Sequence, residues 1–306
     1  MYVSASAGEA QDGYVAAALA EAGFPHDVRT LQLYPRDNRL GARLPNDRMA
    51  WFPLNEQGHA ALVRERRVLR LLQAHCQFSA PRVSYESENG WDLRELVPGT
   101  VDPFGLHARI QRDSAFAYAL GEDLGHVLAE QHTHIPAADL AGWLPVVPGW
   151  PSCDDIPCLP QVVDDVELLA RIDAALRSYA NATRDVCDPV LVHADLGPHN
   201  IAVDPASHRL NGVFDYQGAA FGDRHHDFTY LIFQTAEEPM LDGALAVYEP
   251  ATGIRIDRER VRLFNAVSAI GFLASRHGHA ADEAWCGRTL AEDLAWTDAA
   301  LRLIRL

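Results

Sequence analysis

Lysine is absent from this sequence of 306 residues, and all 26 basic residues are arginine. Cysteine is scarce, and among its five positions only Cys153 and Cys158 lie close together. A zinc site of the common kind needs a second pair of ligands at similar spacing, and the sequence offers none. We therefore expect the thiols to be reduced and structural. The cysteines are Cys76, Cys153, Cys158, Cys187 and Cys286.

Long apolar runs are absent as well. The longest uncharged stretches, such as residues 140–153, are interrupted by proline and glycine and fall short of the roughly 20 residues that a membrane helix needs. The beginning of the chain, MYVSASAGEA, lacks the basic and apolar segments of a secretory signal. We therefore expect no membrane partner and a cytoplasmic location.

Positive charge is in short supply, because the formal net charge is −16. This balance disfavours a nucleic-acid partner, since phosphate backbones are bound by clustered cations. A cationic small molecule would be attracted by the same field. On charge alone, a solvated acidic surface without any partner is the favoured explanation.

The first third of the chain predicts a small sheet with one helix. Short β-like runs are separated by turn clusters such as PRDN and LPND. Residues 58–75 instead carry apolar residues at helical spacing, with Glu65 on the same turns. The β-like runs are residues 28–34, 48–53, 83–85 and 92–97.

The rest of the chain predicts helices. Apolar residues at helical spacing recur over residues 116–128 and 163–176. A proline-rich stretch, residues 144–160, cannot form one continuous helix and indicates an irregular insertion. Later helices are expected over residues 258–277 and 281–304, and strand-like runs over residues 190–203 and 209–214.

These patterns together predict an α+β chain with a bilobal plan. We expect a small sheet-rich lobe over residues 1–97 and a large, mainly helical lobe over residues 98–306. The insertion around residues 143–160 belongs to the second of these lobes.

The segment LVHADLGPHNIAVDPASHRLNGVFDYQGAAFGDRHHDF is the most informative part of the sequence. Apolar residues flank Asp195 and Asn200 within the strand-like run of residues 190–203, and the next strand ends in Asp215, so we expect the two strands to pair as a hairpin. Phosphoryl transfer needs a carboxylate that accepts the proton of an attacking hydroxyl, and oxygen ligands for the magnesium on the nucleotide phosphates. These three residues supply that set.

HADLGPHN resembles the catalytic loop of the aminoglycoside phosphotransferase and choline kinase families, which are relatives of the protein kinases. FDYQGAAFGDRHHDF is similar to the metal-binding segment that follows it there. The resemblance implies a protein-kinase-like fold with a nucleotide-binding first lobe. It also implies that Asp195 is the catalytic base and that Asn200 and Asp215 bind Mg²⁺. By the same resemblance, three further residues have structural and not catalytic roles: His193, Asp223 and Asp227.

WDLRELVPGT resembles the segment that joins the lobes in this family. There the backbone near Glu95 to Val97 would hydrogen-bond the nucleotide base. A strand that simply ends at the Pro-Gly pair is the alternative interpretation.

The sequence departs from the family where a lysine normally holds the nucleotide phosphates, paired with a glutamate on the next helix. RMAWFPL resembles that strand and places Trp51 at the lysine position, while Glu65 resembles the helix glutamate. Arg48 or Arg43 is one candidate replacement, because a guanidinium clamps phosphate oxygens as a fork. Magnesium and backbone amides are a second possibility, and loss of catalysis is a third. In the covering loop, PRDNRLGARLPND, the backbone at Asp37 and Asn38 is a candidate phosphate contact, and a plain hairpin turn is the favoured interpretation.

The expected function is an O-phosphotransferase that moves phosphate from ATP or GTP to a hydroxyl of a small molecule. The resemblance implies an antibiotic acceptor of the aminoglycoside, macrolide or nucleoside type, and hence resistance. A metabolic kinase of choline, homoserine or a sugar stays open, as does a non-catalytic binding protein that keeps the fold. Candidate contacts for a cationic acceptor are Asp154, Asp155, Asp282 and Glu283.

Overall fold

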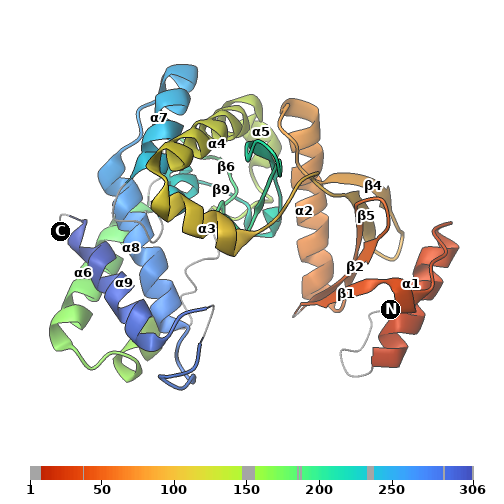
Figure 1. The fold of residues 1–306 in the computed structure, drawn as a ribbon, viewed down its shortest axis with the longest axis horizontal. Helices are drawn as coiled ribbons and strands as arrows, with labels where there is room; N and C mark the ends of the chain where they lie inside the picture. The colour runs from red at the N-terminus through yellow and green to blue at the C-terminus, as the bar shows by residue number, and fades with distance from the viewer. Residues whose placement is uncertain are drawn as a thin grey trace. The chain divides into compact units, whose positions relative to one another are not determined.

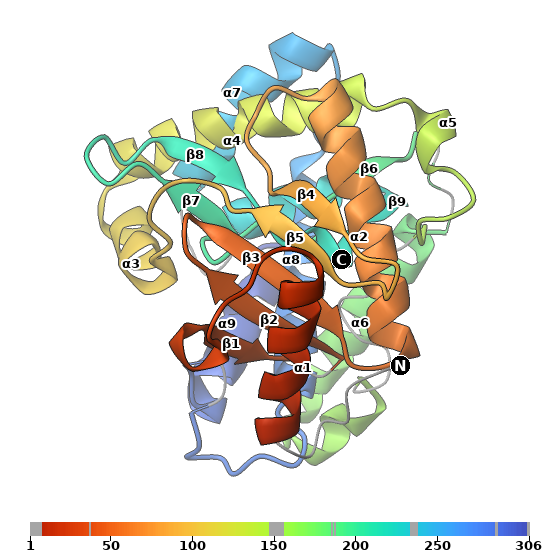
Figure 2. The same cartoon turned by 90° about the vertical axis from the view of Figure 1, so that its right-hand side faces the viewer.

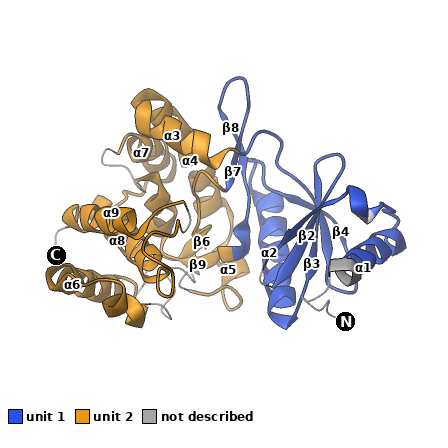
Figure 3. Ribbon diagram, turned by 60° about the horizontal axis from the view of Figure 1, so that its bottom comes forward, with its two compact units in different colours: residues 1–101, 200–217 blue, residues 102–199, 218–306 orange. Residues whose placement is uncertain are grey.

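The computed structural model describes residues 8–36, 38–146, 156–184, 186, 188–232, 238–284 and 287–304. Two compact units divide the chain (Figure 3): residues 1–101 with 200–217 form the first, and residues 102–199 with 218–306 form the second. The chain therefore enters the second unit, returns to the first at Asn200, and leaves it again after Gln217. Asn200 and Asp215 thus belong to the first unit, and Asp195 belongs to the second.

A five-stranded antiparallel sheet in the order β1-β2-β3-β5-β4 is the centre of the first unit. A tight turn joins β2 to β3, where Asn46 and Asp47 have φ values of 61° and 50°, which asparagine and aspartate tolerate better than most residues. The elements are α1 (Gly8–Glu21), β1 (Gln32–Pro35), β2 (Arg39–Leu44), β3 (Arg48–Pro53), α2 (Glu56–His75), β4 (Arg82–Glu86) and β5 (Asp92–Glu95).

The two faces of this sheet differ in chemistry, because successive side chains of a strand point to opposite sides. One face is apolar and packs with Val15 and Leu19 of α1, which lies across β1 and β2 in Figure 2. The opposite side chains of β2 and β5 include Arg39 and Arg94, which reach Glu65 of α2. The apolar face is made mainly of Leu40, Ala42, Leu44, Ala50, Phe52, Trp91 and Leu93.

Helices dominate the second unit, as expected. Its longest helix, α4, packs closely along α7 (Figure 1). Glycine makes this approach possible, because a Cβ atom at Gly121 would collide with the carbonyl oxygen of Met240 and one at Gly243 with that of Tyr118. The helices are α3 (Pro103–Arg112), α4 (Ser114–His134), α5 (Ala137–Leu140), α6 (Val166–Ala182), α7 (Pro239–Thr252), α8 (Arg258–Ala274) and α9 (Leu290–Arg302).

The segment LVHADLGPHNIAVDPASHRLNGVFDYQGAAFGDRHHDF supplies the strands of two short antiparallel ladders. In the first unit β7 (Ile201–Val203) pairs with β8 (Leu210–Val213), which confirms the predicted hairpin. In the second unit β6 (Val190–Val192) pairs with β9 (Ala220–Gly222). The predicted single strand over residues 190–203 is therefore two strands, with residues 193–200 as the loop that connects them.

The predicted α+β class is confirmed, with a sheet-rich start and helices after it. Several boundaries differ from the prediction: β1 covers Gln32–Pro35 and not residues 28–34, residues 39–44 are a strand and not part of a loop, and the last helix begins at Leu290. Thr289 fixes that start, because its side chain and that of Glu292 form a capping box. No helix in the described ranges is long and apolar enough to cross a membrane.

Candidate functional site

Asp195 lies in the loop that follows β6, and its carboxylate is accessible. Its side chain is 42% exposed, and Oδ1 lies 3.1 Å from Nε2 of His199. Burial would raise the pKa of Asp195, but hydrogen bonds from His199 and Tyr230 outweigh it and lower the pKa below its ordinary value. The carboxylate is therefore ionised at neutral pH and able to accept a proton.

A fully buried aspartate, Asp227, holds the backbone of this loop in place. Its Oδ2 accepts a hydrogen bond from the backbone N–H of His193 at 3.0 Å, and its Oδ1 accepts one from Ala194 at 2.8 Å. Ala194 has a φ of 71°, which is rare and costly for a residue other than glycine. The two bonds to Asp227 stabilise this conformation and so position Asp195, the next residue.

Asp227 is itself supported from α4. Nε2 of His132 lies 3.0 Å from Oδ2, and Gln131 donates to the same oxygen at 2.8 Å. Burial lowers the pKa of His132, so the ring is neutral at neutral pH and donates to Asp227 through Nε2. Its Nδ1 is then left to accept from the hydroxyl of Tyr248, 3.0 Å away.

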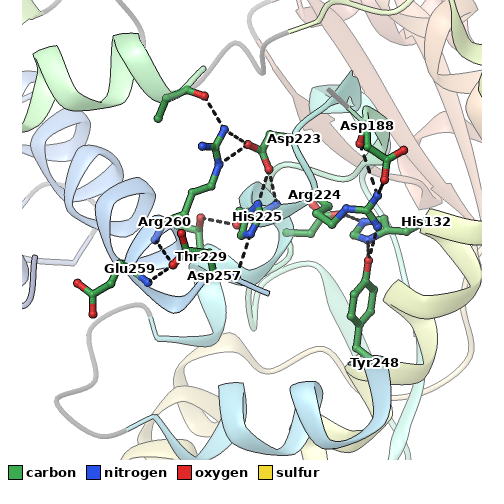
Figure 4. Close-up of polar contacts among 12 residues, drawn as sticks. His132, Asp188, Asp223, Arg224, His225, Thr229, Tyr248, Asp257, Glu259 and Arg260 are labelled. Carbon is green, nitrogen blue, oxygen red and sulfur yellow. Dashed lines mark hydrogen bonds and ion pairs between the residues drawn. The ribbon is translucent and has the colours of Figure 1, made fainter. Parts of the chain in front are cut away.

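A second polar network of this unit surrounds Asp223 (Figure 4). Asp223 accepts from the backbone N–H of His225 at 3.0 Å and from Nε of Arg260 at 2.6 Å, and its pKa lies well below the ordinary value, because hydrogen bonds and the charges of His225 and Arg260 outweigh burial. Arg224 joins Asp188 to the hydroxyl of Tyr248, which it contacts at 2.8 Å. Both networks are buried or half-buried and hold the segment after β9 against α4 and α8.

In the first unit, Asn200 and Asp215 lie at the same end of the β7–β8 ladder. The backbone N–H of Phe214 donates to the carbonyl oxygen of Asn200 at 2.9 Å, one residue before Asp215. Asn200 is buried, while the side chain of Asp215 is 43% exposed and its φ is 66°. An amide and a carboxylate at one end of one hairpin are oxygen donors of the kind that Mg²⁺ binds.

These two residues fit magnesium in its usual mode, in which one or two protein side chains share the ion with phosphates and water. A metal cage built from protein alone is a different arrangement. Across the described ranges, no group of three or more histidine, cysteine, aspartate or glutamate side chains is placed to hold a metal ion.

Arg39 of β2 connects the helix glutamate with Asp215. Its Nη1 lies 2.9 Å from Oε2 of Glu65, and its Nη2 lies 3.2 Å from Oδ1 of Asp215. The guanidinium also stacks on the ring of Trp51, with its central carbon 4.3 Å from the ring centroid. On the far side of Glu65, Arg94 contacts Oε1 at 2.9 Å. The sequence interpretation of the missing lysine did not include Arg39.

The other predicted nucleotide-binding residues lie elsewhere in the first unit. Arg48 contacts the carbonyl oxygen of Pro45 at 3.4 Å and stacks on Phe24, while Arg43 pairs with Asp47 at 3.1 Å. Glu95 ends β5 opposite Arg48, and the half-buried Val97 follows it. Arg39 therefore links Glu65 to Asp215, while Arg48 and Arg43 make other contacts.

The candidate acceptor contacts are only partly within the described residues. Glu283 accepts from the backbone N–H of Ala280 at 3.3 Å and lies 3.2 Å from Nδ1 of His279, while Asp282 is exposed. Asp37 of the covering loop and residues 147–155 of the insertion, which include Asp154 and Asp155, lie outside the described residues.

A protein-family model described as the phosphotransferase enzyme family matches residues 52–264, which is more than half of the chain. The match includes the Asp195 loop, both ladders and Glu65. A search of curated proteins finds no match.

Solved structures share this fold over nearly the whole chain. The GDP complex of aminoglycoside 2′-phosphotransferase-IIIa has a TM-score of 0.67 at 20% identity, covering 95% of this chain and 98% of that one. Macrolide 2′-phosphotransferase MphH from Brachybacterium faecium has a TM-score of 0.63 at 20% identity, covering 96% and 99%. An ADP-bound aminoglycoside phosphotransferase has a TM-score of 0.59 at 18% identity, covering 90% and 94%.

Proposed function

The chain belongs to the phosphotransferase enzyme family, and we propose that it moves the γ-phosphate of ATP or GTP to a hydroxyl of an antibiotic. The observation that carries the proposal is Asp195. Its carboxylate is ionised and half-exposed, on a loop whose backbone is fixed by the buried Asp227. A general base must be deprotonated, accessible to the substrate and held in a fixed position, and Asp195 meets these three conditions.

In the proposed reaction Asp195 accepts the proton of the acceptor hydroxyl while that oxygen attacks the γ-phosphorus. The new bond joins the acceptor oxygen to phosphorus, and the bond from phosphorus to the β,γ-bridging oxygen breaks. The nucleoside diphosphate leaves with the electron pair. No phosphoenzyme is formed, so Asp195 receives a proton and no phosphoryl group.

Asn200 and Asp215 are the residues that would hold magnesium. Their place at one end of the β7–β8 ladder supports this role, and a bound Mg²⁺ supplies neutralisation of the phosphate charge. The half-exposed carboxylate of Asp215 leaves room for phosphate oxygens beside it. Glu95 and Val97 are the proposed backbone contacts of the nucleotide base.

An antibiotic acceptor is supported by the solved structures of similar fold, which include aminoglycoside and macrolide phosphotransferases. The net charge of −16 favours a cationic acceptor and therefore the aminoglycoside class first. The same charge would also attract macrolides that carry a cationic amino sugar. Charge therefore does not distinguish the two classes of acceptor, and the assay below does.

The test is acceptor-dependent nucleotide turnover with Mg²⁺ against aminoglycosides, macrolides, nucleoside antibiotics, choline and homoserine. Asp195→Asn keeps the size of the side chain and removes the base, so we expect turnover to fall by about 100-fold or more. Asp164→Asn is the matched control, because Asp164 is an exposed aspartate of the same unit.

Turnover that requires an antibiotic, disappears in Asp195→Asn and survives in Asp164→Asn would support the proposal. Turnover with choline or homoserine alone would replace the antibiotic by a metabolite as acceptor. Nucleotide binding without turnover on any acceptor would favour a non-catalytic binding protein.

A further inference from the structure

We propose that Arg39 takes the place of the missing phosphate-binding lysine, delivered from β2 instead of β3. The inference rests on the proposed function, because it concerns the nucleotide that the reaction consumes. It begins with the strand register: Gly41 of β2 lies opposite Trp51 of β3, and Arg39 lies opposite Pro53. Arg39, Gly41 and Trp51 therefore share one face of the sheet, the face that Glu65 also reaches.

By the resemblance of RMAWFPL to the family's strand, Trp51 stands at the lysine position, and a tryptophan there provides no cation. Its ring lies against Gly41, where a Cβ atom would come within 2.9 Å of the ring. The Arg39 guanidinium lies over this ring, with its central carbon 4.3 Å from the ring centroid, which is a favourable cation–π distance. Trp51 thus supports a cation from the neighbouring strand instead of providing one.

The contacts of Arg39 are those that the role demands. One end of its guanidinium is held by Glu65, the residue that resembles the family's helix glutamate, at 2.9 Å. The other end lies 3.2 Å from Asp215, the proposed magnesium ligand, whose side chain is half-exposed. Phosphates bound through that metal would meet a positive charge at this place.

The protein groups that the structure describes do not fully satisfy the guanidinium of Arg39. A guanidinium carries five N–H donors, and within the residues that the structure describes Nε of Arg39 has no hydrogen-bond acceptor. The side chain is only 4% exposed, so an unused donor here is costly in the nucleotide-free protein. Arginine also suits the geometry, because a planar fork contacts Glu65 with one nitrogen and keeps another directed toward Asp215.

The neighbouring arginines are less suitable for this role. Arg94 is held by Glu65 and by both carboxylate oxygens of Asp92. Arg66 is held by Asp92, Glu86 and the carbonyl oxygen of Gly90. Among these three buried arginines, only Arg39 is in contact with Asp215.

The experiment compares the binding of ADP and GDP with that of adenosine and guanosine by calorimetry, with Mg²⁺ present. The variant Arg39→Met keeps the length of the side chain and removes the charge, and Glu65 stays paired with Arg94. We expect diphosphate affinity to fall by about 10- to 100-fold and nucleoside affinity to change by less than about 2-fold. Arg82→Met, at an exposed arginine of β4, is the matched control.

A second variant tests the position itself. Adding Trp51→Lys to Arg39→Met places a lysine on the same face of the sheet, and we expect it to restore diphosphate affinity to within about 10-fold of the unmodified protein. Circular dichroism and thermal melting check that each variant is folded.

Three results would overturn the inference. The first is a diphosphate affinity that is unchanged in Arg39→Met. The second is a loss of diphosphate affinity in Arg48→Met, measured in the same way, and not in Arg39→Met. The third is that adding Trp51→Lys restores no diphosphate affinity. If the unmodified protein binds none of these nucleotides, the proposed function fails as well, and this result differs from all three.

Discussion

His199 and Asp195 are four residues apart in one loop, and Nε2 of the histidine lies 3.1 Å from Oδ1 of the aspartate. Both side chains are nearly half-exposed, so the pair faces solvent on one side. The hydrogen bond favours the charged form of Asp195 and contributes to its lowered pKa. His199 therefore influences the ionisation of the group that we propose as base.

His199→Gln should move the acidic limb of the activity profile to higher pH. A base works only while deprotonated, so activity falls as the pH drops through the pKa of Asp195. Removing the histidine weakens the stabilisation of the carboxylate, and that pKa rises toward its ordinary value. The measurement is kcat/KM against pH, with the exposed His134→Gln as control. An acidic limb that stays in place would show that His199 does not tune Asp195.

Asp227→Asn should destabilise the protein and weaken catalysis together. The carboxylate accepts bonds from two backbone N–H groups and from His132, and an amide can replace only some of them. We expect a loss of about 3 kcal/mol in the free energy of unfolding by urea, since a buried charged acceptor is lost. The exposed Asp164→Asn should lose almost nothing. Equal stability of the two variants would contradict the bracing role of Asp227.

The sequence was sufficient for the α+β class and for the family because both depend on local signals. Apolar residues at helical spacing predicted α2, α4, α6 and α8. The motif from His193 to Asp227 could be recognised from its residues without knowing the fold. Asp195, Asn200 and Asp215 were therefore identified by pattern alone. Their roles stay predictions until activity is measured.

Arg39 was missed because its strand was missed. Residues 36–47 contain proline, asparagine and glycine, which are typical of turns, and the apolar alternation of residues 40, 42 and 44 was hidden among arginines. A strand assigned there would have placed Arg39 and Trp51 on one face. The ion pair with Glu65 still could not have been predicted, because it depends on how α2 packs on the sheet.

Acid sensitivity should be traceable in part to His226. Burial lowers the pKa of this histidine to about 4, against an ordinary value of 6.5. Between these two pKa values, the histidine binds a proton in the unfolded chain and not in the folded protein. The free energy of unfolding therefore falls as the pH drops from 6.5 toward 4, by about 3 kcal/mol for this one group. His226→Phe keeps a ring against Phe264, whose centroid lies 4.5 Å away, and should lose less stability between pH 7 and 5. An unchanged slope of unfolding free energy with pH would contradict this assignment.

Magnesium dependence should reside in Asp215. Asp215→Asn removes the negative charge that attracts the metal but leaves an oxygen donor at the end of the β7–β8 ladder. In the unmodified protein, we expect Mg²⁺ to increase the thermal stabilisation produced by ADP or GDP. In the variant, about 10-fold more Mg²⁺ should be needed for the same shift, because a carboxylate binds the ion more strongly than an amide. Glu88→Gln, at an exposed carboxylate of the same unit, should leave the Mg²⁺ requirement unchanged. Arg39 also loses an ion-pair partner in Asp215→Asn and is then held mainly by Glu65. A nucleotide shift that is independent of Mg²⁺ in both proteins would contradict the metal site, whatever the activity of the enzyme.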